Sequence, residues 1–248
     1  MEQNIMPGAE PFRFEGNETG ILVSHGFTGT TQSVRPLGEA LAAEGFTVAG
    51  PRLAGHGTTM DDHAKNGASD WISSIEEDLA WLEVRCERVF FAGLSMGGMF
   101  SLYFAAMRPD LIRGIIPINA CVFLGNPDLA RLVFNPNAPA TVPGVGSDIK
   151  MEGGEELVYP EVPVPPLKEF MAIMRTTDDL LPAIECPALV IQSLEDHVVP
   201  PENGPYIFER LGSVQKELVR LEESYHVATL DNDAPFIHER AVEFIRGN

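Results

Sequence analysis

Compact apolar runs alternate with amphipathic stretches along most of the chain. Short apolar runs bounded by turn residues predict buried strands, here at 21–24, 89–92, 115–118 and 188–191, with a further strand at 216–221. Apolar residues three and four positions apart predict amphipathic helices, here over 34–44 and 70–85. Strands that alternate with helices favour an α/β fold, in which a mostly parallel central sheet carries helices on both faces.

Residues 119–170 break this alternation. Eight of the chain's 20 prolines lie between Pro127 and Pro166, yet the segment carries too many apolar residues for a disordered linker. A long irregular insertion of this kind is typical of a lid or binding loop, although a merely decorative insertion is the alternative. We therefore expect an α/β core of residues 1–118 and 171–248, and a cap of residues 119–170 that folds over the carboxyl edge of the sheet.

The charge balance argues against two classes of partner. The chain of 248 residues has 17 basic and 36 acidic side chains, a formal net charge of −19, spread along its length. Such a surface repels nucleic acid and anionic membranes, so we expect neither as a partner. No run approaches the roughly 18 apolar residues of a membrane span, so we expect no integral membrane association.

The cysteines and the first residues of the chain bear on the cellular compartment in which the protein acts. Residues 1–4 have no basic start and no apolar run follows them, which predicts that a secretory signal is absent. Cys86, Cys121 and Cys186 lie far apart without metal-ligand spacing, which is typical of buried free thiols in a reducing cytoplasm. The sequence shows no metal cluster and no phosphate-binding glycine loop, so we expect chemistry without a metal or cofactor.

Ser95 is the candidate nucleophile. It is the central residue of Gly93-Leu94-Ser95-Met96-Gly97, which follows the apolar run 89–92 and opens a helix-like stretch. A strand, a sharp turn and a helix with serine at the tip form the context of a nucleophile elbow. The glycines leave room for the turn, and the helix directs its positive N-terminus at the site where negative charge develops.

A serine of this kind needs a base and an orienting carboxylate, in the chain order serine, acid, histidine. Asp196 follows the predicted strand 188–191, and His226 follows the strand 216–221. Side chains just past the ends of parallel strands can converge despite their separation in sequence. Glu195 competes for the orienting role, but the phrase Asp196-His197-Val198-Val199-Pro200 places Asp196 at the turn that leaves the strand.

The backbone N–H groups of Phe27 and Met96 are the candidate oxyanion donors. Phe27 lies in the glycine-bearing turn after strand 21–24, and Met96 follows the candidate nucleophile. The other histidines have less direct interpretations. His25 and His56 lie in glycine-bearing turns, and we expect them to shape loops near the site. The remaining three are interpreted as surface or loop residues, namely His63, His197 and His238.

The chain resembles the bacterial monoacylglycerol lipases and related small carboxylesterases of the α/β-hydrolase fold, from about Glu10 to the C-terminus. The phrases that carry the resemblance are His25-Gly26-Phe27-Thr28-Gly29-Thr30, Pro51-Arg52-Leu53-Ala54-Gly55-His56-Gly57, Gly93-Leu94-Ser95-Met96-Gly97-Gly98, Asp196-His197-Val198-Val199-Pro200 and Ser224-Tyr225-His226. The resemblance implies the triad Ser95, Asp196 and His226, with Phe27 and Met96 as oxyanion donors. The chain departs most from the family's pattern in the cap, between residues 123 and 145.

A cap glutamate binds the glycerol moiety in the bacterial monoacylglycerol lipases. Gly146-Ser147-Asp148-Ile149-Lys150, followed by Glu155-Glu156-Leu157, is similar to that stretch, which implies this role for Glu156. We therefore expect a cofactor-free serine hydrolase that cleaves monoacylglycerols, with an apolar acyl chain under the cap. Three alternatives remain open: a broad carboxylesterase for short- to medium-chain esters, a cofactor-free haloperoxidase, and a non-enzymatic protein of the same fold. A dehalogenase is disfavoured, because it needs a carboxylate where Ser95 stands.

Overall fold

A seven-stranded sheet forms the centre of the computed structural model, which describes residues 5–248. The strands are β1 (Phe12–Phe14), β2 (Thr19–Ser24), β3 (Thr47–Gly50), β4 (Arg88–Leu94), β5 (Ile112–Ile118), β8 (Ala188–Ser193) and β9 (Lys216–Leu221). They are arranged in the order β1-β3-β2-β4-β5-β8-β9. Only β1 runs antiparallel to its neighbour. The α/β fold and all five predicted strands are confirmed. The N-terminal stretch 1–4, used to argue against a signal, lies outside the described residues.

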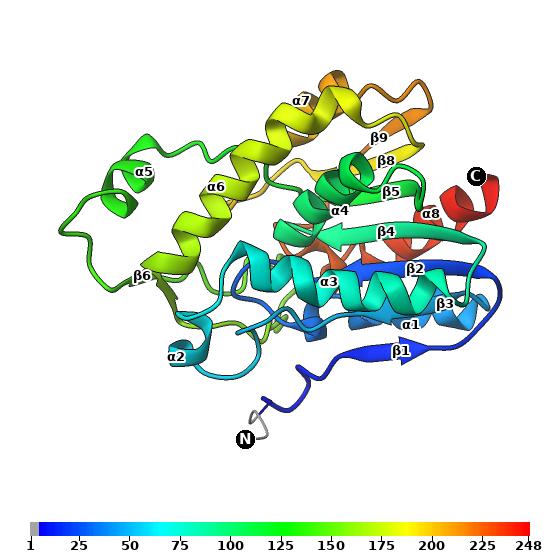
Figure 1. The fold of residues 1–248 in the computed structure, drawn as a ribbon. Coiled ribbons are helices and arrows are strands. Elements are labelled where there is room, and N and C mark those ends of the chain that lie inside the picture. The colour runs from blue at the N-terminus through cyan, green and yellow to red at the C-terminus, as the bar shows by residue number, and fades with distance from the viewer. Residues whose placement is uncertain (1–4) are drawn as a thin grey trace.

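Helices cover both faces of the sheet (Figure 1). One face packs against α1 (Arg35–Ala43) and α8 (Ala234–Gly247), which touch each other. The other face carries α3 (Ala68–Glu83), α4 (Met96–Met107), α6 (Val164–Leu180) and α7 (Asn203–Arg210). The remaining short turns are α2 (Met60–His63) and the 3₁₀ turns Thr31–Ser33, Leu181–Ala183 and Ala228–Leu230.

Strand β4 shows why the apolar runs are continuous rather than alternating. Phe90 and Ala92 pack with the helices α1 and α8, whereas Val89 and Phe91 pack on the opposite face with α3 and α4. A parallel strand covered on both faces buries every side chain. The buried run of β4 continues to Leu94 at the carboxyl edge of the sheet, one residue before Ser95.

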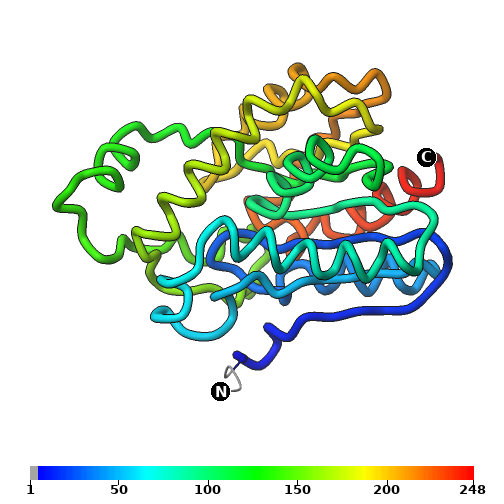
Figure 2. The backbone as a smooth tube through the Cα atoms, in the orientation of Figure 1, coloured from blue at the N-terminus to red at the C-terminus, as the bar shows by residue number. Residues whose placement is uncertain are grey.

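The cap leaves the sheet after β5 and returns through α6 (Figure 2). It holds the helix α5 (Pro127–Val133) and a small antiparallel pair, β6 (Thr141–Pro143) with β7 (Glu161–Pro163). Figure 1 shows α5 and β6 beyond the end of the sheet to which β4 points. Pro165 and Pro166 occupy the first turn of α6, where proline is tolerated because the N–H there has no helical partner. Helix α6 runs through residue 170, so no break in secondary structure marks the expected end of the cap.

Two further features bear on the expectations from the sequence. Every helix in residues 5–248 is too short or too polar to span a bilayer. All three cysteines are free thiols, but only Cys121 is buried, since Cys86 and Cys186 are partly exposed. The expectation of three buried thiols is therefore wrong for two of them.

Candidate active site

Ser95 occupies a strained turn between β4 and α4. Its φ of 55° and ψ of −115° lie outside the conformations that a serine ordinarily adopts. Its N–H donates to Ile118 O at the end of β5, 2.9 Å away, which ties the turn to the sheet. A Cβ at Gly93 would lie 2.3 Å from the Gly97 carbonyl carbon, so only glycine permits so close an approach across the turn. Such strain at a fixed serine is characteristic of a functional site.

Asp196 and His226 meet next to this turn. His226 Nδ1 lies 2.8 Å from Asp196 Oδ2, and the Asp196 side chain is fully buried. Asp196 Oδ1 accepts the backbone N–H groups of Val198 and Val199, at 2.9 and 2.8 Å, so both carboxylate oxygens are hydrogen-bonded. Glu195 is half exposed and makes no bond to His226. The geometry therefore favours Asp196 over Glu195 as the partner of His226.

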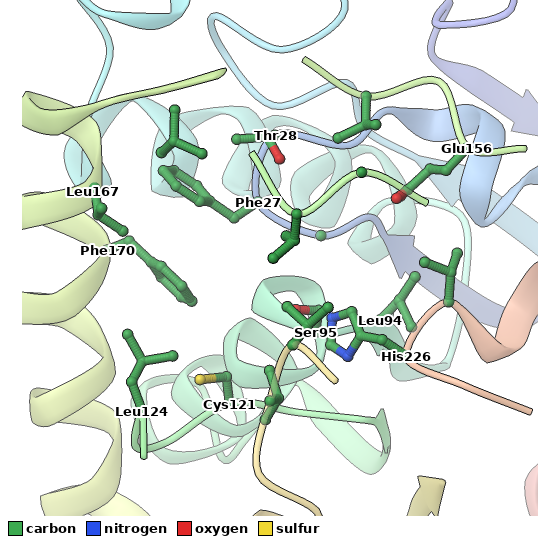
Figure 3. Close-up of a pocket in the computed structure, with 18 of the residues that line it drawn as sticks. Phe27, Thr28, Leu94, Ser95, Cys121, Leu124, Glu156, Leu167, Phe170 and His226 are labelled. Carbon is green, nitrogen blue, oxygen red and sulfur yellow. The ribbon is translucent and has the colours of Figure 1, made fainter. Parts of the chain in front are cut away.

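Several carboxylates set the charge state of His226. Its burial lowers the pKa, but Asp196, Glu156 and Asp148 together raise it, and the net result is a pKa above the ordinary value of 6.5. The Nδ1 proton faces Asp196, which leaves Nε2 as the basic nitrogen of the neutral ring. Ser95 and His226 both line one pocket and lie close together in Figure 3.

Two backbone N–H groups beside Ser95 have no partner among the described residues, those of Phe27 and Met96. Met96 is the first residue of α4, where the helix leaves its N–H groups unpaired. Phe27 is held in place by stacking on Phe170 of α6, with ring centroids 5.0 Å apart. Gly26 lets the Phe27 turn approach, because a Cβ there would lie 3.2 Å from Ser95 Cβ. Both N–H groups are thus available to a ligand.

The pocket above Ser95 has an apolar side and a polar side (Figure 3). Leu124, Leu167 and Phe170, from the cap and α6, gather on one side of Ser95, and Glu156 lies on the other. Burial raises the pKa of Glu156 to about 7, although His226 and Ser33 act in the opposite direction. The arrangement suits a ligand with an apolar chain at one end and hydrogen-bonding groups at the other.

The irregular segment of the cap that carries Glu156 is hydrogen-bonded to the core. Leu157 N donates to Gln32 Oε1 at 3.0 Å, and Gln32 Nε2 donates to Glu155 O at 3.1 Å. Glu156 N donates to Ser147 Oγ at 2.9 Å. These bonds fix the backbone on both sides of Glu156, so its carboxyl group is held at the pocket rather than free in solvent.

The prediction that His63 is a surface or loop residue is wrong. It ends the short helix α2 and is fully buried against Phe27, His56 and Tyr159. Helix α2 directs the side chain of its last residue towards a cluster of aromatic rings. A helix of four residues is too short for a hydrophobic periodicity that would predict this burial. His56 is fully buried beside it. His25 does shape a loop: its Nδ1 contacts Gly26 O at 2.9 Å.

The two other histidines interpreted as surface or loop residues differ from each other. His197 is exposed, as predicted, but its Nδ1 lies 2.8 Å from Asp148 Oδ1. His238 lies within helix α8 and is partly buried, so it is neither fully exposed nor in a loop.

Sequence reasoning assigned no role to Asn119 or Asp148. Asn119 adopts a φ of 44° and donates through Nδ2 to His226 O at 2.7 Å. Asp148 accepts the N–H groups of His197 and His226. The one available signal was the position of Asn119 directly after strand 115–118. Among residues 5–248, no group of three ligating side chains is placed to hold a metal ion.

A parallel sheet with a strained serine after one strand, and an aspartate and a histidine after two later strands, defines the α/β-hydrolase class of proteins. The family model described as the alpha/beta hydrolase family matches residues 21–239. This chain belongs to that family. The predicted fold class and resemblance are therefore confirmed.

Individual relatives agree with this family. The chain is 47% identical to a thermostable monoacylglycerol lipase of Bacillus sp. (strain H-257), with 97% of this chain and 95% of that protein covered. It is 29% identical to a carboxylesterase of Bacillus subtilis (strain 168), with 95% and 96% covered. A solved structure from the pair LipS and LipT, two metagenome-derived lipolytic enzymes, matches with a TM-score of 0.97 and 53% identity, covering 99% of this chain and 100% of that one.

Proposed function

We propose that this protein hydrolyses carboxylic esters through an acyl-enzyme on Ser95, and that its substrates are monoacylglycerols. The observation that carries the proposal is the bonded pair His226–Asp196, 2.8 Å apart, beside a strained serine at the base of an apolar pocket. The 47% identity to a monoacylglycerol lipase over 97% of the chain supports the substrate class.

In the acylation step, Ser95 Oγ attacks the ester carbonyl carbon while His226 Nε2 takes the hydroxyl proton. Asp196 keeps the other ring nitrogen protonated and stabilises the imidazolium that forms. His226 then gives its proton to the departing alcohol. In deacylation, a water molecule attacks the acyl-enzyme by the same proton transfers, and the fatty acid leaves.

The oxyanion forms between the unpaired N–H groups of Phe27 and Met96. Two donors fixed in advance stabilise the charge without reorganisation during the reaction. The positive N-terminus of α4 lies at the same place and adds to the stabilisation.

The two sides of the pocket orient the substrate. The acyl chain lies against Leu124, Leu167 and Phe170, and the alcohol faces Glu156. The carboxyl group of Glu156 accepts hydrogen bonds from glycerol hydroxyls. Esters of simple alcohols lack these hydroxyls and leave the carboxyl with fewer hydrogen bonds. The three free cysteines support action in a reducing compartment such as the cytoplasm.

The test compares hydrolysis of monolauroylglycerol and ethyl laurate by the wild type and by Glu156→Ala. Both esters carry the same acyl chain, so a difference in kcat/KM reports recognition of the alcohol. We expect a preference for the glyceride that falls in the variant. Glu152→Ala, an exposed cap residue, is the matched control and should leave the preference intact. Equal rates on both esters, unchanged in Glu156→Ala, would instead identify a general carboxylesterase.

A further inference from the structure

Asp148 connects the cap to two loops of the core. It lies between β6 and β7, and its side chain is only 13% exposed. Asp148 Oδ2 accepts the backbone N–H of His197 and the backbone N–H of His226, both at 3.1 Å. Its second oxygen, Oδ1, lies 2.8 Å from His197 Nδ1. Both oxygens of one cap carboxylate are therefore used on core residues.

These two core residues are the ones that matter for the triad geometry. His197 follows Asp196 directly, and His226 is the proposed base. A single oxygen of Asp148 thus sets the spacing between the two backbone segments whose side chains must meet at 2.8 Å. A shift of either segment by about 1 Å would lengthen the His226–Asp196 bond and misplace Nε2 relative to Ser95.

The backbone of His226 is held at both of its polar groups. Asp148 accepts its N–H, and Asn119 donates to its carbonyl oxygen at 2.7 Å. Asn119 directly follows β5, so this second contact comes from the edge of the sheet where the cap begins. Asp148 in the cap and Asn119 at the end of the sheet therefore each supply one hydrogen bond to the histidine's peptide groups.

Further bonds hold the Asp148 segment in place. Asp148 O accepts the N–H of Val227 at 3.0 Å. Lys150 N and Met151 N both donate to the carboxylate of Asp231, at 2.7 and 2.8 Å. The segment is thus attached to the loop that follows β9 at Asp148 itself and at two residues on its C-terminal side, which restricts its movement relative to His226.

We propose that Asp148 is a positioning residue for His226: the cap completes the active site by holding the histidine and aspartate loops in register through one carboxylate. This inference rests on the proposed ester hydrolysis at Ser95. It assigns the cap a second role, because removing the cap contact disturbs the base as well as the acyl pocket.

The charge of Asp148 acts on the pKa of His226, and the pH dependence of activity therefore gives a test that a purely structural role would not affect. Three carboxylates face His226, those of Asp196, Glu156 and Asp148, and together they raise its pKa against the effect of burial. Asp148 Oδ1 faces the ring of His197, whose Nε2 lies 3.6 Å from Glu195 Oε1. Loss of the Asp148 charge should therefore lower the pKa of His226, and with it the pH midpoint of activity.

Two substitutions separate the bonds from the charge. Asp148→Ala removes both oxygens, whereas Asp148→Asn keeps one oxygen for the two backbone N–H groups and removes the charge. Asp70→Asn is the matched control. It also removes one negative charge and one carboxylate that accepts a backbone N–H, but Asp70 is exposed on α3 and outside the site. Each protein is assayed with p-nitrophenyl butyrate over a range of pH, below its melting temperature.

We expect Asp148→Ala to lower kcat by roughly 10- to 100-fold with little change in KM, as misplacement of a catalytic group does. Asp148→Asn should retain more of kcat and move the midpoint of the pH–kcat/KM profile to lower pH, and Asp70→Asn should match the wild type. If Asp148→Ala does not fold, kcat and the pH midpoint of Asp148→Asn alone test the positioning role. A wild-type kcat and midpoint in the folded Asp148 variants would overturn the positioning role, whereas a wild type without esterase activity would overturn the proposed function itself.

Discussion

A Cβ atom at Gly97 would lie 2.1 Å from the carbonyl oxygen of Ser24. Gly97 belongs to the first turn of α4, and Ser24 ends β2, so helix and strand meet backbone to backbone. This contact brings the N-terminus of α4 and the turn that holds Phe27 to the same side of Ser95. The proposed oxyanion site therefore depends on the absence of a side chain at residue 97.

Gly97→Ala should destabilise the protein and reduce its activity. The added methyl group meets backbone atoms that cannot move independently of the sheet, and overpacking of this kind costs about 1–3 kcal/mol or more. Thermal unfolding measures the loss, and residual esterase activity reports the distorted site. Gly247→Ala is the control, because a Cβ there meets no atom within 4 Å. Equal melting temperatures for the two variants would contradict the close packing of α4 on β2.

Ser95→Ala should lower turnover by several orders of magnitude, on the order of the 10⁶-fold loss known for other triad serines. The variant should also fail to react with a fluorophosphonate probe, which bonds only to an activated serine. Ser73→Ala, on the exposed face of α3, should keep both properties. Substantial activity in Ser95→Ala would rule out this nucleophile.

The elbow was predictable because its requirements are local. The glycines at 93 and 97 and the apolar strand before them are within a few residues of Ser95, so the sequence around the serine is enough to recognise the turn. Asp196 and His226 were predictable for a different reason. Each follows a strand, and parallel strands bring their carboxyl ends to one edge of the sheet.

The parts that were missed depend on contacts between distant segments. Asp148 bonds to residues 49 and 78 positions away, in an irregular stretch with no strand or helix to predict its direction. The sequence predicts a surface or loop position for His63, because nothing in its short segment indicates the buried aromatic cluster into which it packs. In both cases tertiary packing, rather than local pattern, decides where the side chain lies.

Leu167→Trp should shorten the acyl side of the pocket. Leu167 faces the pocket from α6 near Phe170, and a larger side chain there occupies space that a long acyl chain needs. We expect kcat/KM for p-nitrophenyl laurate to fall at least about tenfold relative to the butyrate ester, the effect of roughly 1.4 kcal/mol of lost apolar contact. Lys168→Met, one residue away and not part of the pocket lining, is the control. An equal loss on both esters would place the acyl chain elsewhere.

The pH dependence of kcat/KM should show an ascending limb with a midpoint above 6.5. His226 must be neutral to take the serine proton, and nearby carboxylates raise its pKa above that ordinary value. Glu156→Gln removes a carboxyl group with a pKa of about 7, whose charge builds up over the same pH range, and should move the midpoint to lower pH. An ester without glycerol, p-nitrophenyl butyrate, keeps alcohol recognition out of the comparison. A midpoint below 6.5 in the wild type would mean that burial outweighs the carboxylates at His226.

The buried histidines should make the protein lose stability in acid. Burial lowers the pKa of both His25 and His63 from 6.5 to about 4 in the folded protein. The unfolded chain binds these protons near pH 6.5, so stability is complete above that pH and falls as the pH drops from 6.5 towards 4. Each histidine accounts for on the order of 3 kcal/mol across this range.

His63→Leu isolates one of these contributions. Neither ring nitrogen of His63 has a hydrogen-bond partner among the described residues, so an apolar side chain of similar size loses no bond. Urea unfolding at pH 8 gives the packing cost of the substitution, because the histidine is neutral there in both states. Between pH 6.5 and 4.5 the variant should lose less stability than the wild type, and its unfolding free energy should overtake or approach the wild-type value. Parallel curves for the two proteins over this range would show that His63 does not stay neutral in the folded state.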